Sequence, residues 1–66
     1  QDIKTFEPGQ TVRVQGPPYA SMVGKLLRLR PGLSQLSNGL RAAAADVLLE
    51  SNQQVIIPLS NLEVLD

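Results

Sequence analysis

The fold is decided by nine consecutive residues, Gly16-Pro17-Pro18-Tyr19-Ala20-Ser21-Met22-Val23-Gly24. They contain the only tyrosine and the only methionine of the chain. Two successive prolines cannot donate to a sheet ladder, and they stiffen the backbone toward an extended geometry. The closing Gly24 suits a backbone geometry or a close approach that a side chain would block. We therefore predict a rigid surface loop between two strands.

The segments on either side of this loop predict strands. Residues 11–15 alternate and are rich in β-branched side chains, with Val12 and Val14 facing inward and Arg13 outward. Residues 25–30 form the second strand, but neither of its two faces would be cleanly apolar if the strand were regular. A bulge or a strong bend would reconcile this pattern. Without one, the register of this strand stays open.

A proline–glycine pair precedes the first strand. Pro8 and Gly9 fit the central positions of a type II turn, because proline fixes the first and glycine accepts a positive φ at the second. We expect Phe6, the only phenylalanine, to fold back over one end of the core. A ligand-stacking role for this ring is the less favoured interpretation.

The middle of the chain leaves two interpretations open. Asn38-Gly39 predicts a turn within an excursion over residues 33–39. Residues 40–46 contain four alanines, which favour a helix by propensity, yet they run directly into the strand-like residues 47–50. We favour a long strand with small side chains, and a single helical turn is the alternative.

The end of the chain predicts a hairpin and a closing strand. Residues 51–54 are polar and read as a turn, and residues 55–57 are the most β-prone triplet, ended by Pro58. Residues 59–62 suit one turn of 3₁₀-helix, and residues 63–65 form a short last strand. About five short strands with one 3₁₀ turn are typical of a small, highly bent all-β barrel.

Composition limits the classes of protein. The 66 residues make one domain, and a chain of this size buries only about 60% of the surface that its unfolded form exposes. There is no cysteine and no histidine, which excludes a disulfide framework and a thiolate or imidazole zinc site. Because residue 1 is glutamine, we expect residues 1–66 to be a domain excised from a longer chain. Stability then depends on the aliphatic core, on a partner or on that parent chain.

The hydropathy pattern argues against a membrane role. Apolar residues make up 42% of the chain and charged residues 18%, which is typical of a globular protein. No apolar stretch reaches the roughly 18 residues that a membrane span needs, and the first residues show no signal pattern. We expect a cytoplasmic protein with no membrane partner.

Net charge is zero but unevenly spread. The basic residues of segment 11–41, where there is no acid, are Arg13, Lys25, Arg28, Arg30 and Arg41. Residues 42–66 carry four acids and no base. This separation can indicate a nucleic-acid face, or paired strands can place the two halves side by side so that they neutralise each other. We favour neutralisation, because strong nucleic-acid binders are usually basic overall.

Catalytic groups are scarce. Five serines have no histidine to act as their base. Asp46 and Glu50 are four apart and could form an acid/base pair, but we favour solvated strand residues that face basic neighbours. No glycine-rich phosphate loop and no dense carboxylate cluster is present. We therefore expect no enzyme activity, no cofactor and no metal.

Two segments resemble a known family. Residues 9–14 followed by residues 16–25 resemble the KOW motif, in which a valine-rich strand leads to a glycine–proline–aromatic loop and a glycine, here Gly24, opens the next strand. Residues 55–64 resemble the close of SH3-like barrels, where a 3₁₀ turn links the last two strands. Ser21 stands where KOW loops commonly carry a second glycine. The resemblance implies a five-stranded SH3-like barrel of KOW type that contacts RNA or other proteins.

The loop suggests the leading function. Its residues carry no charge, unlike the lysine-rich loops common in KOW domains, which favours protein over RNA as the partner. We predict a non-catalytic interaction module that docks to a protein partner, or to other domains of a parent chain, through residues 16–24, with Pro17, Pro18, Tyr19 and Met22 in contact. A second interpretation of Tyr19 leaves the ring packed over the barrel mouth with its hydroxyl in water.

The alternative function uses the basic strand 25–30. An RNA- or DNA-binding KOW domain would hold phosphates with the five basic residues named above, provided that they converge. The single exposed tyrosine would offer little stacking surface for a single strand.

Overall fold

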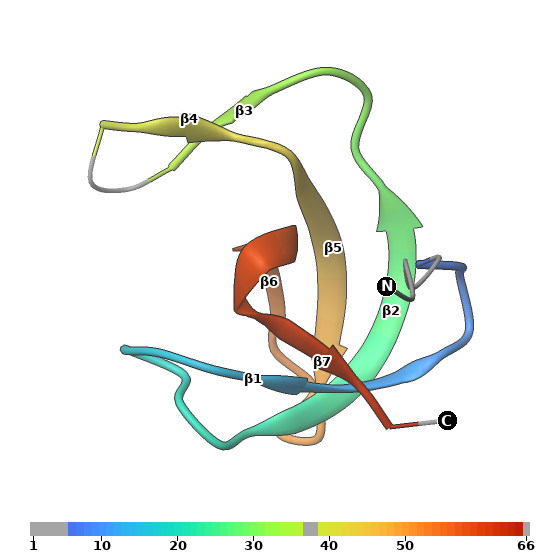
Figure 1. The fold of residues 1–66 in the computed structure, drawn as a ribbon. Coiled ribbons are helices and arrows are strands. Elements are labelled where there is room, and N and C mark those ends of the chain that lie inside the picture. Colours follow the sequence, from blue (N-terminus) through green and yellow to red (C-terminus); the bar gives the residue numbers. More distant parts are fainter. Residues whose placement is uncertain (1–5, 37–38, 66) are drawn as a thin grey trace, which may run out of the picture.

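The computed structural model describes residues 6–36 and 39–65, and their fold is all-β (Figure 1). The elements are β1 (Thr11–Val14), β2 (Val23–Leu29), β3 (Ser34–Gln35), β4 (Arg41–Ala42), β5 (Ala44–Leu49), β6 (Gln54–Pro58), the 3₁₀ turn η1 (Leu59–Asn61) and β7 (Leu62–Val64). Within those two ranges no helix is long and apolar enough to cross a membrane.

Five of the strands form one antiparallel sheet in the order β6-β5-β2-β1-β7. Figure 1 shows β2 and β5 side by side and curved, with β1 and β7 running across their lower half. The short strands β3 and β4 pair only with each other and form a separate hairpin at the upper end. The β1–β2 loop and the β3–β4 hairpin therefore project from the sheet.

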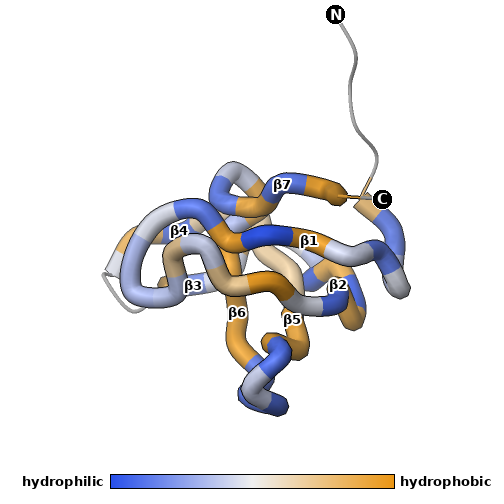
Figure 2. The backbone as a smooth tube through the Cα atoms, turned by 90° about the horizontal axis from the view of Figure 1, so that it is seen from below, coloured by the Kyte–Doolittle hydropathy of each residue, from blue (hydrophilic) through white to orange (hydrophobic). Residues whose placement is uncertain are grey.

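The core lies on the inner face of this curved sheet. Alternation in β1 is as predicted, with Val12 and Val14 buried and Arg13 exposed. The remaining core side chains come from β2, β5, β6 and β7, namely Leu26, Ala45, Val47, Leu49, Val55, Ile57 and Leu62. Full burial of one valine or leucine contributes about 1.5–3 kcal/mol. Figure 2 shows the hydrophobic stretches of β5 and β6 side by side.

The end of the core is covered as the sequence predicts. Phe6 is partly buried and packs against the core cluster. Gly9 has a φ of +93°, and the N–H of Gln10 donates to the carbonyl oxygen of Glu7 at 3.3 Å. This geometry agrees with the turn predicted at Pro8 and Gly9.

A β-bulge in β2 resolves the mixed faces of residues 25–30. Leu26 lies opposite Val47, but the next pair is Arg28 opposite Asp46, so that Leu27 is the extra residue. Leu26 is therefore buried, while Leu27 is exposed. The bulge confirms the predicted irregularity and places an arginine beside the aspartate.

Gly24 has no room for a side chain. A Cβ at this position would lie 2.6 Å from the carbonyl oxygen of Leu48 and 3.0 Å from Val47. The glycine sits where β1, β2 and β5 come together, opposite Val12 and Leu49. The predicted close approach is therefore confirmed.

The alanine-rich segment is extended, and the helical alternative is wrong. β4 and β5 are interrupted only at Ala43, and the small Ala44 and Ala45 are both buried. Small side chains therefore occupy buried positions of β5, as the favoured long strand predicts.

The count of about five strands omitted the β3–β4 hairpin. The N–H of Leu36 donates to the carbonyl oxygen of Leu40 at 2.7 Å, and Gly39, between β3 and β4, has a φ of +87°. Asn38 of the predicted turn lies outside the described residues.

Candidate interaction groove

An open groove of about 480 Å³ runs along β6. One wall is the β1–β2 loop with the end of β1, a second is Gln35 and Leu36 of the β3–β4 hairpin, and the floor follows residues 53–58 to Asn61 of η1. Its volume lies within the range of ligand-binding sites. The groove is therefore the place where segments distant in sequence meet beside a strand.

The groove carries no charge. Its lining falls entirely within residues 14–24, 31–40 and 51–62, and none of these three stretches contains a lysine, arginine, aspartate or glutamate. Only the first of these stretches was predicted as an uncharged surface. The lack of charge over about ten successive residues is the sequence signal by which the second wall and the floor could have been predicted.

Backbone hydrogen bonds hold the loop in place. The N–H of Val14 donates to the carbonyl oxygen of Met22 at 2.8 Å, and the N–H of Ser21 donates to the carbonyl oxygen of Val14 at 2.8 Å. The N–H of Gln15 donates to the carbonyl oxygen of Asn61 at 2.7 Å, which ties the loop to η1. Because the wall is already ordered, a ligand would not have to order it on binding.

Three of the four predicted contact residues line the groove. Pro17 and Pro18, joined by a cis peptide bond, are exposed on its wall. Tyr19 lines the groove and also packs against the core, and its hydroxyl accepts a hydrogen bond from Nε2 of Gln53 at 3.4 Å. The packed ring of the second interpretation is confirmed, although its hydroxyl bonds to Gln53, and partner contact through Tyr19 stays a prediction. Met22 packs against the core and is not part of the lining.

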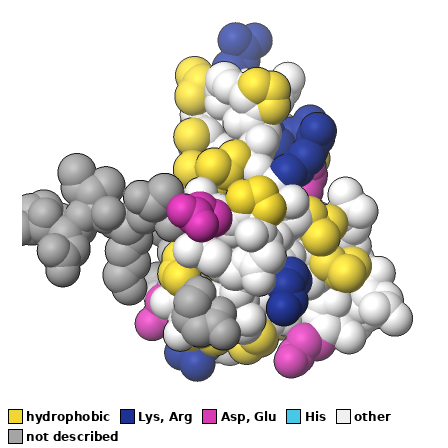
Figure 3. All heavy atoms as spheres, turned by 90° about the vertical axis from the view of Figure 1, so that its right-hand side faces the viewer, with side chains coloured by type: hydrophobic (Ala, Val, Ile, Leu, Met, Phe, Trp, Pro, Cys, Tyr) yellow, Lys and Arg dark blue, Asp and Glu magenta, His cyan; other side chains and the backbone are white. Residues whose placement is uncertain are grey.

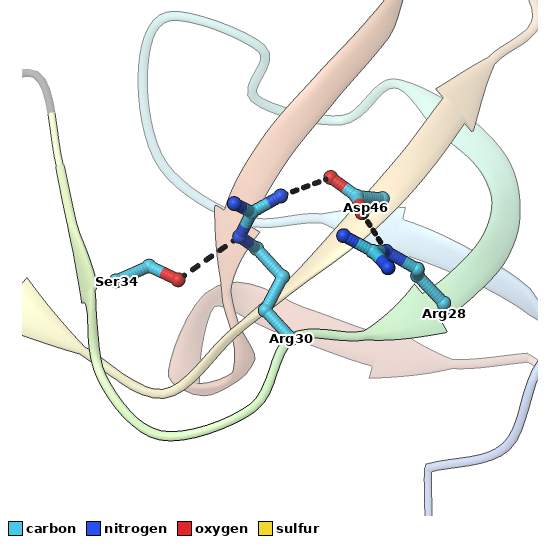
Figure 4. Close-up of polar contacts among 4 residues, drawn as sticks. All are labelled: Arg28, Arg30, Ser34 and Asp46. Atoms are coloured by element: carbon cyan, nitrogen blue, oxygen red, sulfur yellow. Dashed lines mark hydrogen bonds and ion pairs between the residues drawn. The ribbon is translucent and has the colours of Figure 1, made fainter.

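Two of the predicted basic residues share one buried carboxylate (Figure 4). Nε of Arg28 donates to Oδ2 of Asp46 at 2.7 Å, and Nη1 of Arg30 donates to Oδ1 at 3.0 Å. Nε of Arg30 also donates to Oγ of Ser34 at 3.1 Å, which connects β2 to the hairpin. Each carboxylate oxygen thus has its own guanidinium partner.

The electrostatics of this cluster keep Asp46 ionised. Its side chain is only 7% exposed. The hydrogen bond from Arg28 lowers the pKa of Asp46, and the contribution of Arg30 adds to it, against the opposing effect of burial. Asp46 faces basic neighbours, as predicted. The prediction that it is solvated is wrong, because its side chain is buried.

The five basic residues do not converge on one surface. Nη1 of Arg13 lies 3.5 Å from Oε1 of Glu63, an exposed pair on β1 and β7. Among residues 6–36 and 39–65, Lys25 and Arg41 have no carboxylate within ion-pair distance, and they lie on β2 and β4. On the face that Figure 3 draws, basic side chains form separate patches with hydrophobic and uncharged surface between them. The favoured neutralisation is confirmed for Arg13, Arg28 and Arg30.

The second candidate site, Asp46 with Glu50, does not form. Glu50 follows the end of β5, about 13 Å along the extended chain from Asp46. Asp46 is occupied by the two arginines. In the part of the chain that the structure describes, no group of three acidic, histidine or cysteine side chains could hold a metal ion.

No protein-family model, curated protein or solved structure matches this chain.

Proposed function

We propose that the chain is a non-catalytic interaction module that docks to a protein partner through the loop of residues 16–24. The observation that carries this proposal is the uncharged groove bordered by that loop. Pro17 and Pro18 present exposed apolar surface beside the tyrosine ring. Tyrosine is enriched in protein interfaces, because its ring supplies contact area and its hydroxyl a polar contact.

The proposed architecture is a five-stranded SH3-like barrel of KOW type. The sheet order β6-β5-β2-β1-β7 and the 3₁₀ turn before β7 support this assignment. The position of Gly24, packed against the backbone of β5 at the start of β2, supports it as well. In this proposal the groove lies between the first long loop and the strand that precedes the 3₁₀ turn.

RNA or DNA binding by the strand of residues 25–30 is the second candidate. One observation favours it, since the Arg28 side chain remains 62% exposed although it is paired with Asp46. Neutralisation by Asp46 and Glu63 weakens the proposal, because phosphate binding draws on cationic side chains that release counterions. The groove itself offers phosphates no cation.

Chemical-shift mapping separates the two candidates. The 66-residue chain is titrated at low salt with a peptide selected from a displayed random library, and separately with short single-stranded RNA and DNA. Protein docking predicts shifts at residues 16–19 and 53–57 with the peptide. Shifts at Arg28 and Arg30 with RNA or DNA, with none in the groove for any selected peptide, would contradict it.

A further inference from the structure

The strand β6 has one free edge. It ends the order of the five-stranded sheet and pairs with β5 alone. Two backbone hydrogen bonds, both of 2.9 Å, show which residues face β5. At one end the N–H of Leu49 donates to the carbonyl oxygen of Gln53, and at the other the N–H of Leu59 donates to the carbonyl oxygen of Ala43. In an antiparallel ladder successive residues direct their backbone groups to opposite sides. The odd-numbered residues of β6 therefore bond to β5.

The even-numbered residues direct their backbone groups away from the sheet. The backbone groups of Val55 and Ile57 bond to β5, whereas the N–H and C=O of Gln54 and Ile56 point away from β5. Within the described residues no other group bonds to these outward atoms. Pro58, the last residue of the strand, has no N–H and is the N-cap residue of η1, so it adds no donor to this edge.

This edge forms the floor of the uncharged groove. All of residues 53–58 line it, and the loop at Pro17–Tyr19 stands on the other side. Exposed edges are ordinarily protected by charged side chains, but residues 51–62 contain none. The triplet at residues 55–57 also has a high preference for extended structure. The edge is thus open, uncharged and ready to pair.

We propose that the partner binds as an extended, uncharged peptide segment that adds a strand to the free edge of β6. This inference rests on the proposed docking function and names its ligand class. Hydrogen bonds at Gln54 and Ile56 would supply affinity, and alternate side chains of the added strand would lie against the loop. The absence of charge in the lining matches an uncharged segment, and the groove volume lies within the range of ligand-binding sites.

The test uses peptides selected on the full 66-residue chain from a phage-displayed random heptapeptide library. Affinity for the best synthetic peptide is compared among wild type, Gln54→Pro and Gln54→Ala. The proline removes an outward N–H that β5 does not use, while the alanine keeps that N–H and removes the side chain. Strand addition predicts a loss of about tenfold or more for Gln54→Pro, or 1.4 kcal/mol, and little change for Gln54→Ala. Equal affinity of all three proteins would overturn it.

Amide hydrogen exchange of the wild type gives a second readout that does not depend on a variant folding. The peptide should slow exchange at Gln54 and Ile56 by about tenfold or more, while Val55 and Ile57 are already protected without it. Unchanged exchange at Ile56 would reject the added strand. Protection that grows with protein concentration, without peptide, would assign the edge to a second copy of this chain and also reject the proposal.

A Tyr19→Ala variant separates this inference from the docking function on which it rests. Loss of peptide binding in Tyr19→Ala but not in Gln54→Pro would leave loop docking intact and reject strand addition. Loss in Gln54→Pro alone would support the added strand and remove the loop from the contact. Failure to enrich any peptide on the wild-type chain would count against both.

Discussion

Nε of Arg28 donates to Oδ2 of Asp46 at 2.7 Å, and the two residues face each other only because a bulge at Leu27 shifts the register of β2 against β5. The same carboxylate holds Arg30, whose guanidinium also reaches Ser34. One buried aspartate thus joins the bulged strand to the segment that leads into the β3–β4 hairpin. The pairing has consequences for stability that can be measured.

We predict that Asp46→Asn destabilises the domain by about 1–3 kcal/mol, because it leaves two guanidinium groups without their carboxylate partner. The range is moderate because both arginines keep access to water. Urea denaturation of the two proteins measures the change in the free energy of unfolding. Glu63→Gln is the matched control, since its exposed pair with Arg13 should contribute less than about 1 kcal/mol. Equal losses in both variants would contradict this role of Asp46.

Stability should also depend on pH through Asp46. Because the arginines lower the pKa of Asp46 in the folded protein, its contribution is complete above the ordinary aspartate pKa of about 3.9. It is lost progressively as the pH falls through the lower, folded-state value. Unfolding free energies between pH 7 and pH 2 should therefore fall more steeply for wild type than for Asp46→Asn. Parallel curves would show that Asp46 is not selectively stabilised as the anion.

Gly24→Ala should destabilise the domain by at least about 1–3 kcal/mol, since its Cβ would lie 2.6 Å from the backbone oxygen of Leu48. Thermal unfolding measures the effect. Lys25→Ala is the control on the same strand, and its exposed side chain predicts a change within about 0.5 kcal/mol. A Gly24→Ala protein as stable as wild type would show that β2 and β5 separate easily at this point.

The uncharged groove predicts that removing surface cations leaves peptide binding intact. Arg28→Gln and Arg41→Gln should bind a selected peptide with affinities within about twofold of wild type, with little dependence on salt. Isothermal titration at 50 mM and 300 mM salt would show this. A tenfold loss in either variant, or a steep fall with salt, would instead point to the basic side chains as the contact surface.

Local sequence patterns predicted much of the fold. The alternation of Val12 and Val14, the Pro8–Gly9 turn and the closing 3₁₀ turn each depend on a few adjacent residues. The irregularity of β2 could also be inferred, because residues 25–30 present no clean apolar face. In each case a short-range preference and the final structure agree.

The remaining features depend on contacts between distant segments. Two-residue strands such as β3 and β4 carry no periodicity, so the sequence predicted a turn at Asn38-Gly39 but not the strands on either side of it. The burial of Asp46 follows from the register that the bulge creates, which the sequence alone left open. Of the groove, the loop at Pro17–Tyr19 was predicted, but the edge of β6 was not, because its exposure depends on sheet order.

The central claim is that the loop of residues 16–24 is the wall of a protein-docking groove. It is tested most directly by the affinity of one selected peptide for wild type, Tyr19→Phe and Tyr19→Ala. The phenylalanine keeps the ring and removes only the hydroxyl that accepts from Gln53. We predict near wild-type affinity for Tyr19→Phe and a loss of about tenfold or more for Tyr19→Ala, as at an interface hot spot. Unchanged affinity of a folded Tyr19→Ala protein would contradict the claim.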